Sequence, residues 1–170
     1  MNRILFFIMI FFCTSSNAQV KKSIDKISGD TTWFSAFEKL YSKASFSGTV
    51  GEQLKVVVSR DKKGYQMGVW LQTAKSLSYT INEGDTMRIK CKDETVINLP
   101  VIGNGAETIS DNLTGSTSIT LFKLDNVNLK LLLEKEIVFI RIEGSPGYLE
   151  YDIKDKFQSV VSKCIKSIVK

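Results

Sequence analysis

The fold class is decided by the stretch Leu-Lys-Val-Val-Val-Ser-Arg-Asp-Lys-Lys-Gly-Tyr-Gln-Met-Gly-Val-Trp-Leu at residues 54–71 of the 170-residue chain. Residues 54–59 are rich in valine, and apolar side chains recur at every second position from Tyr65 to Leu71. Between these two segments, residues 61–64 are Asp-Lys-Lys-Gly, which favours a turn. Two such segments on either side of a turn predict an antiparallel hairpin.

The strand pattern continues toward the C-terminus. Residues 77–81 alternate apolar and polar, 82–85 are Asn-Glu-Gly-Asp, and 87–91 alternate again, which predicts a second hairpin. The next strand, residues 95–99, is expected to end at Pro100, because proline has no N–H to donate to a strand ladder. Further strands are predicted over residues 118–124, 137–142 and 148–153, the last two joined by the Gly-Ser-Pro-Gly turn at 144–147.

Residues 101–116 contain turn formers and show little periodicity. A loop of this length is usually mobile or functional, unless it hides an irregular edge strand. The sequence leaves these interpretations open.

The C-terminus carries the clearest helix pattern. Asp155 stands where an N-cap is expected, and the lysines fall on the face opposite the apolar stripe. The apolar stripe consists of Phe157, Val160, Val161, Cys164, Ile165 and Ile168. A shorter helix is predicted from Asp125 to about Lys135. Residues 31–42 are ambiguous between helix and strand, and the spacing of the large apolar residues from Trp33 to Tyr41 favours a helix.

These elements predict one α+β domain over residues 19–170. The expected architecture is a mainly antiparallel β sandwich or curled half-barrel with the C-terminal amphipathic helix packed on it. A seven-strand barrel capped by one helix, similar to pleckstrin-homology domains, is the alternative. About 150 residues bury roughly two thirds of their unfolded surface, which is enough for one core.

The N-terminus has the form of a secretory signal peptide over residues 1–18. Arg3 precedes the apolar run Ile4 to Phe12, and Ser16-Asn17-Ala18 precedes Gln19. The run is shorter than the ~20 apolar residues that cross a bilayer, so no transmembrane segment is expected after cleavage. Lipid anchoring at Cys13 is disfavoured because phenylalanine, not a small residue, precedes it. The sequence therefore predicts export to the periplasm or the extracellular space.

The amino-acid composition excludes several kinds of catalytic and metal site. Histidine is absent, which excludes Ser-His-Asp and Cys-His catalysis and histidine-containing zinc sites. Removing residues 1–18 takes away Arg3 and no carboxylate, so 22 cations face 18 anions, a net charge of +4. No catalytic motif, metal site or cofactor is expected, and the protein is predicted not to be an enzyme.

Cys91 and Cys164 remain after signal cleavage, and both are placed on apolar faces. Export would permit a disulfide between them. Two unpaired thiols that act as small core residues are the favoured interpretation. A catalytic thiol is not expected, because no neighbouring group in the sequence would generate the thiolate.

Two features are candidates for binding. Arg88, Lys90 and Lys92 form a cationic row on one strand face, which suits acidic glycans or lipid headgroups but is more simply a solvated sheet face. Export makes nucleic acid an unlikely partner for this row. Trp70 alternates with Met67, Val69 and Leu71, so it is expected to point away from the core, where it could act as a stacking platform. The favoured interpretation is that the segment from Trp33 to Tyr41 covers it.

Carboxylates and threonines provide two further sets of candidates. Glu143, Glu150 and Asp152 lie close together on the 137–153 hairpin, where paired carboxylates could support glycosidase chemistry. A solvated, ion-paired hairpin is the favoured interpretation. Thr31 and Thr86 each follow an aspartate, and these Asp-Thr pairs resemble short acceptors for O-linked glycans in Bacteroidota-type bacteria.

The order of elements over residues 50–168 resembles small exported β-rich proteins of unknown function from Bacteroidota-type bacteria. The resemblance rests on the Gly84-Asp85 turn, on Ile-Val-Phe-Ile-Arg-Ile at 137–142 and on Tyr-Leu-Glu-Tyr-Asp-Ile at 148–153 before the final helix. It implies an exported β-rich fold and transfers no catalytic residue.

The expected function is therefore that of a non-enzymatic exported module that binds a protein or glycan at the cell envelope, through the Trp70 side or residues 101–116. A carboxylate-dependent glycan-active enzyme and a structural envelope component are the alternatives.

Overall fold

A computed structural model of the chain describes residues 20–26, 28–44, 51–73, 79–104, 109–111, 115–145 and 147–169. The predicted signal peptide, Cys13 included, lies outside the described residues. The strands are β1 (Lys21–Ile24), β2 (Thr31–Phe34), β3 (Glu38–Lys43), β4 (Glu52–Asp61), β5 (Gly64–Thr73), β6 (Thr86–Cys91), β7 (Val96–Asn104), β8 (Ile109–Asp111), β9 (Gly115–Leu124), β10 (Ile137–Gly144) and β11 (Gly147–Asp152). The helices are α1 (Asn126–Glu134), the short 3₁₀ turn η1 (Asp155–Phe157) and α2 (Val160–Ile168).

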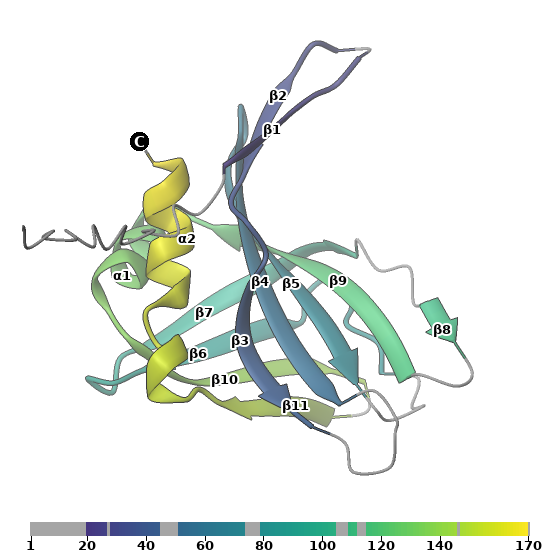
Figure 1. The fold of residues 1–170 in the computed structure, drawn as a ribbon, viewed down its shortest axis with the longest axis vertical. Coiled ribbons are helices and arrows are strands. Elements are labelled where there is room, and N and C mark those ends of the chain that lie inside the picture. The colour runs from purple at the N-terminus through teal and green to yellow at the C-terminus, as the bar shows by residue number, and fades with distance from the viewer. Residues whose placement is uncertain are drawn as a thin grey trace, which may run out of the picture.

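The strands form one curled antiparallel sheet. Its order is β1-β2-β4-β5-β9-β7-β6-β10-β11, with β3 paired to β4 and β8 paired to β9. The strands β3, β4, β5 and β9 form one layer, and β7, β6, β10 and β11 cross behind them (Figure 1). Within the described residues the path of pairings runs from β1 to β11 without closing. The predicted fold class is confirmed as a curled open sheet, and the alternative of a seven-strand barrel does not describe it.

The hairpin predicted at residues 54–71 is confirmed as β4 and β5. The two strands pair from Gln53↔Gln72 to Asp61↔Gly64. The Asp61 carboxylate accepts hydrogen bonds from the backbone N–H groups of Lys63 and Gly64 at 2.7 and 3.1 Å, which closes the turn. Gly64 adopts φ +125°, a conformation that side chains rarely tolerate.

The second predicted hairpin is wrong in its pairing. The turn at residues 82–85 forms, with Asp85 accepting from the N–H of Asn82 at 2.7 Å. However, β6 pairs with β7 on one edge and with β10 on the other. Thr80 instead makes a single bridge to Ser145. Both edges of β6 are thus occupied by strands from later in the chain, which leaves no edge for the preceding segment.

The predicted strand end at Pro100 is also wrong, because β7 runs on to Asn104. Pro100 pairs with Thr86 of β6, and the next residue, Val101, already pairs with Phe122 of β9. The strand therefore changes partner at the proline, where a missing N–H disrupts neither ladder. β8 pairs with the first residues of β9, so the segment 101–116 does contain an edge strand.

The helix favoured within residues 31–42 is wrong, since this segment forms β2 and β3. Ser35, between the two strands, explains the outcome. Its N–H donates to the Val58 carbonyl at 2.8 Å, and its hydroxyl accepts from the Val58 N–H at 2.9 Å. The segment thereby satisfies the backbone of the β4 edge, and Leu40 enters the core.

Both predicted helices form. Asp125 caps α1 by accepting from the Asn128 N–H at 2.7 Å, as expected. The apolar stripe of α2 is buried, which confirms its orientation. Asp155 is not the N-cap of α2, because it begins η1 and α2 starts only after Ser159. The Asp155 carboxylate instead accepts from the side-chain amide of Gln158 at 2.9 Å.

The core is shared by both layers of the sheet and by the helices. It is one cluster of buried apolar residues that extends from Leu40 to Ile168. The Ser162 hydroxyl joins the two helices by donating to the Leu133 carbonyl at 2.8 Å. In the part of the chain that the structure describes, no helix has the length and apolar character needed to cross a membrane.

Candidate functional site

Trp70 lies on the outer face of β5, as its alternation predicts, but it is not an open platform. Its ring is half-buried, and the Lys55 ammonium lies 4.4 Å from the ring centroid. The expectation that residues 33–41 cover this tryptophan is wrong, because β2 and β3 extend the same sheet alongside β4. A cation from the neighbouring strand occupies the position over the ring instead.

The cationic row on β6 is paired with carboxylates. Arg88 contacts Glu143 at 2.7 Å, and Lys90 contacts Glu94 at 2.6 Å. Lys92 contacts Glu136 at 3.1 Å. Each cation of the row therefore has an anionic neighbour, which weakens the positive potential that an acidic ligand would need.

The carboxylates of the 137–153 hairpin are brought together, but in ion pairs. Glu143 holds Arg88, and Glu150 accepts from the Arg141 Nε at 2.9 Å. Asp152 is exposed at the end of β11. This arrangement is the solvated, ion-paired hairpin that the sequence favoured over a pair of acid and base groups.

The remaining candidates are the two cysteines and the two threonines. Cys91 and Cys164 are both free and buried, so the structure shows no disulfide between them. Thr31 and Thr86 are half-buried residues that open β2 and β6. O-glycosylation at these two threonines stays a prediction.

Another hollow among the described residues lies where the β1–β2 hairpin leaves the sheet. It has a volume of about 580 Å³. Its walls are formed by Val20, by β2, by the end of β4 with the turn that follows, and by the end of α2. Figure 1 shows these elements at the same end of the molecule. Its lining consists of Val20, Thr31, Trp33, Arg60, Asp61, Lys62, Ser167 and Ile168. We call this hollow the Trp33 cleft.

The cleft exists because β2 pairs with β4 over only a short distance. Trp33 pairs with Arg60 and Phe34 pairs with Ser59, and beyond these pairs the β1–β2 hairpin projects away from the sheet. Trp33 is 42% exposed, which leaves much of a large aromatic side chain accessible to a ligand. The Lys22 ammonium lies 5.4 Å from the Trp33 ring centroid.

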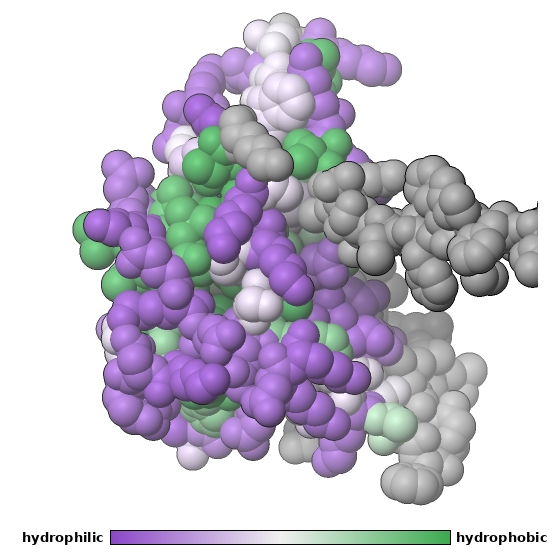
Figure 2. Space-filling view, turned by 60° about the vertical axis from the view of Figure 1, so that its left-hand side comes forward, coloured by the Kyte–Doolittle hydropathy of each residue, from purple (hydrophilic) through white to green (hydrophobic). Residues whose placement is uncertain are grey.

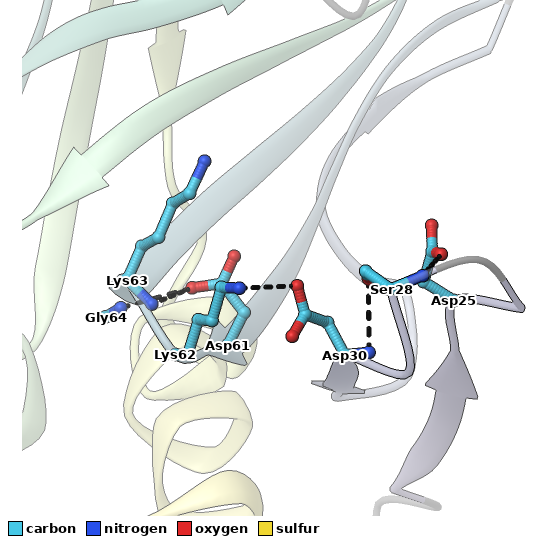
Figure 3. Close-up of polar contacts among 7 residues, drawn as sticks. All are labelled: Asp25, Ser28, Asp30, Asp61, Lys62, Lys63 and Gly64. Atoms are coloured by element: carbon cyan, nitrogen blue, oxygen red, sulfur yellow. Dashed lines mark hydrogen bonds and ion pairs between the residues drawn. The ribbon is translucent and has the colours of Figure 1, made fainter.

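An ion pair ties the tip of the projecting hairpin to the β4–β5 turn. The Lys62 ammonium lies 2.7 Å from the Asp30 carboxylate (Figure 3). The hydrogen bond from Lys62 lowers the pKa of Asp30 below its ordinary value of 3.8. The same figure shows Asp61 turned toward the N–H groups of its own turn.

Sequence reasoning missed the Trp33 cleft. The strand composition of Thr31-Thr32-Trp33-Phe34 was a valid indication that Trp33 lies on a sheet, but nothing local indicates that Arg60 stands beside it. That neighbour is set by the β2–β4 register. Alternation within one strand predicts a face and does not predict the cross-strand partner.

Within the described ranges, no three His, Cys, Asp or Glu residues lie close enough together to hold an ion. A second hollow, lined by Lys92, Asp93, Glu134, Lys135 and Glu136, contains ion pairs between Lys135 and Asp93 and between Lys92 and Glu136. Both of its lysines are therefore already paired with carboxylates.

Comparison with models of protein families, with curated proteins and with solved structures gave no match. The resemblance to small exported Bacteroidota-type proteins therefore stays a prediction.

Proposed function

We propose that the chain is an exported, non-enzymatic binding module that holds a glycan of the cell envelope in the Trp33 cleft. The observation that carries the proposal is the position of Trp33, an accessible indole on the wall of a hollow that also presents polar side chains. Aromatic rings with an apolar face and a polar edge are suited to stacking on sugar rings, whose C–H faces are apolar.

The size and lining of the cleft support a small polar ligand. Ligand sites commonly measure about 300 to 1,000 Å³. The cleft, at about 580 Å³, is lined mostly by polar and charged residues, Thr31 and Ser167 among them, and its apolar part consists of Val20, Trp33 and Ile168. A short oligosaccharide needs this combination, because its rings stack while its hydroxyl groups take hydrogen bonds.

The predicted export of the chain supports a glycan as its partner. The signal-peptide pattern of residues 1–18 would bring the mature chain to the periplasm or beyond, where glycans are abundant. The absence of histidine from the sequence, together with the ion-paired state of Glu143 and Glu150, favours binding over hydrolysis.

The two tryptophans allow a matched test by glycan array and titration calorimetry. Trp33→Ala should lose glycan binding, because the stacking surface disappears. Trp70→Ala should retain binding, because Trp70 lies on β5 and does not line the cleft. Circular dichroism of both variants checks that the fold persists. Binding that survives Trp33→Ala, or an array without any glycan bound, would contradict the proposal.

A protein partner is the second candidate, and a different surface favours it. Figure 2 shows apolar side chains gathered on the side of the molecule that carries α1 and the end of α2. Val127 on α1 is 69% exposed and Val169 is 42% exposed. The simplest partner to test is a second copy of the chain, by sedimentation velocity of the wild type and Val127→Lys. A concentration-independent monomer would exclude self-association.

A further inference from the structure

We infer that the ligand of the Trp33 cleft carries a carboxylate, as a uronic-acid oligosaccharide does, and that Arg60 binds this group. The inference rests on the proposed glycan binding and names the chemical class of the glycan. It depends on the position of Arg60, on the N–H donors of Arg60 that no carboxylate pairs with among the described residues, and on the geometry of a guanidinium group.

Arg60 stands directly beside the stacking surface. It is the cross-strand partner of Trp33 in the β2–β4 register, and both residues line the cleft. Side chains of directly opposed residues lie on the same face of a sheet, with Cβ atoms about 4.5 to 5.5 Å apart. A sugar ring stacked on Trp33 therefore presents its substituents to the Arg60 guanidinium.

Arg60 also differs from the other arginines of the described chain. Arg88 is paired with Glu143, and Arg141 is paired with Glu150. The Arg60 guanidinium lies 5.5 Å from the ring centroid of Tyr65, and among the described residues no carboxylate pairs with it. Stacking on Tyr65 restrains the side chain while its N–H donors stay free for a ligand.

The carboxylates near the cleft have partners other than Arg60. One carboxylate oxygen of Asp61 accepts from the N–H groups of Lys63 and Gly64, and Asp30 pairs with Lys62 (Figure 3). Because Arg60 forms no ion pair among the described residues, its N–H donors remain available to an anionic group of a ligand.

The planar guanidinium matches a planar carboxylate. It can donate two parallel hydrogen bonds to the two oxygens of one carboxylate, whereas a lysine ammonium acts as a point charge. A uronic acid combines a ring that stacks on Trp33 with a carboxylate at its edge. This combination favours an acidic sugar over an acidic peptide, which lacks the ring.

The experiment compares tetragalacturonate with the neutral galactose tetrasaccharide by titration calorimetry at fixed ionic strength. The wild type should bind the acidic sugar at least about tenfold more tightly, the factor that corresponds to about 1.4 kcal/mol. Arg60→Gln should remove most of this preference. Arg60→Lys should restore it only in part, because the charge returns without the planar pair of donors.

Lys63→Gln is the matched control, since it removes the same charge from the β4–β5 turn. The Lys63 side chain points away from the Asp30–Lys62 contact in Figure 3 and does not line the cleft. It should change the affinity less than about twofold, as expected of a distant, solvent-screened charge. Thermal melting of each variant confirms that the fold is retained.

The outcomes separate this inference from the proposed function. Equal affinity for the two sugars, with Arg60→Gln like the wild type and Trp33→Ala inactive, would overturn carboxylate recognition and leave glycan binding intact. No saccharide binding at Trp33 would overturn the proposed function itself. Binding of hexaglutamate instead of tetragalacturonate, with the same loss in Arg60→Gln, would also overturn the inference, because the anion would then belong to a peptide.

Discussion

Burial keeps the two thiols of the described chain in their protonated form. Cys91 and Cys164 have no exposed surface. Desolvation raises the pKa of Cys164 to about 11, and it also raises the pKa of Cys91 above its ordinary value of 9.0. The thiolate is the reactive species, so both residues should act as small core side chains and not as nucleophiles.

The raised pKa of Cys164 predicts how the free energy of unfolding depends on pH in the alkaline range. The pKa of Cys164 is higher in the folded state than the ordinary 9.0 of an unfolded thiol. Its contribution to stability is therefore complete below pH 9 and is lost as the pH rises toward about 11. Urea unfolding from pH 8 to pH 11 should show the stability gap between the wild type and Cys164→Ala becoming smaller.

Val161→Ala is the control for this measurement, because it removes a neighbouring core side chain that does not titrate. Its stability gap to the wild type should stay constant over the same pH range. A constant gap for Cys164→Ala as well would show that the thiol does not titrate differently in the two states.

At the scale of the elements, the residues just before β6 contact the end of β10 through a single backbone bridge and one side-chain hydrogen bond instead of a strand ladder. The residues before β6 are attached to the end of β10 by the bridge between Thr80 and Ser145. Tyr79 adds a hydrogen bond from its hydroxyl to the Ile142 carbonyl at 2.8 Å. Gly144 allows this approach, because a Cβ there would lie 2.6 Å from the Thr80 carbonyl oxygen.

Gly144→Ala should therefore destabilise the protein. The added methyl group would force the backbone of Thr80 to move, and overpacking of this kind costs about 1 to 3 kcal/mol. Gly103→Ala is the matched control within β7, since a Cβ at that position meets no atom within 4 Å. Urea unfolding of both variants checks the prediction, which fails if Gly144→Ala is as stable as Gly103→Ala.

In the molecule as a whole, one core holds the sheet layers and the helices together. Buried residues from β4, β6, β10 and α2 belong to the same cluster. A core shared in this way favours cooperative unfolding of all the elements, as small single domains usually show. The β1–β2 hairpin is the exception, because β1 is exposed along its whole length.

Ile165→Ala tests the contribution of α2 to this core. Ile165 is fully buried, so its truncation should cost about 2 to 5 kcal/mol. The exposed neighbour Lys166 provides the control, and Lys166→Ala should leave the stability nearly unchanged. Far-ultraviolet circular dichroism and tryptophan fluorescence should report one coincident transition for each variant. Separate transitions would show that α2 unfolds independently of the sheet.

Local pattern was sufficient wherever neighbouring residues in the chain are also partners in the fold. The β4–β5 hairpin, the Asp125 cap and the buried face of α2 are of this kind. The pairing of β6, the path of β7 through Pro100 and the strands at residues 31–43 were predicted wrongly. Each of these depends on a strand from a distant part of the chain, which supplies hydrogen bonds that override local preference.

The residues of the candidate site also divide into those that local pattern places and those that only distant strands place. Sequence alone determined the exclusion of histidine chemistry, the mainly antiparallel class of the fold and the outward direction of Trp70, because composition and alternation are properties of single segments. Only the tertiary structure decided that a lysine lies over each tryptophan ring, Lys55 on Trp70 and Lys22 on Trp33, and that the exposed Trp33 stands beside Arg60. The physical reason is that the register between strands places the side chains of a ligand site next to one another. This register depends on which strand edges, distant in sequence, satisfy each other's backbone hydrogen bonds.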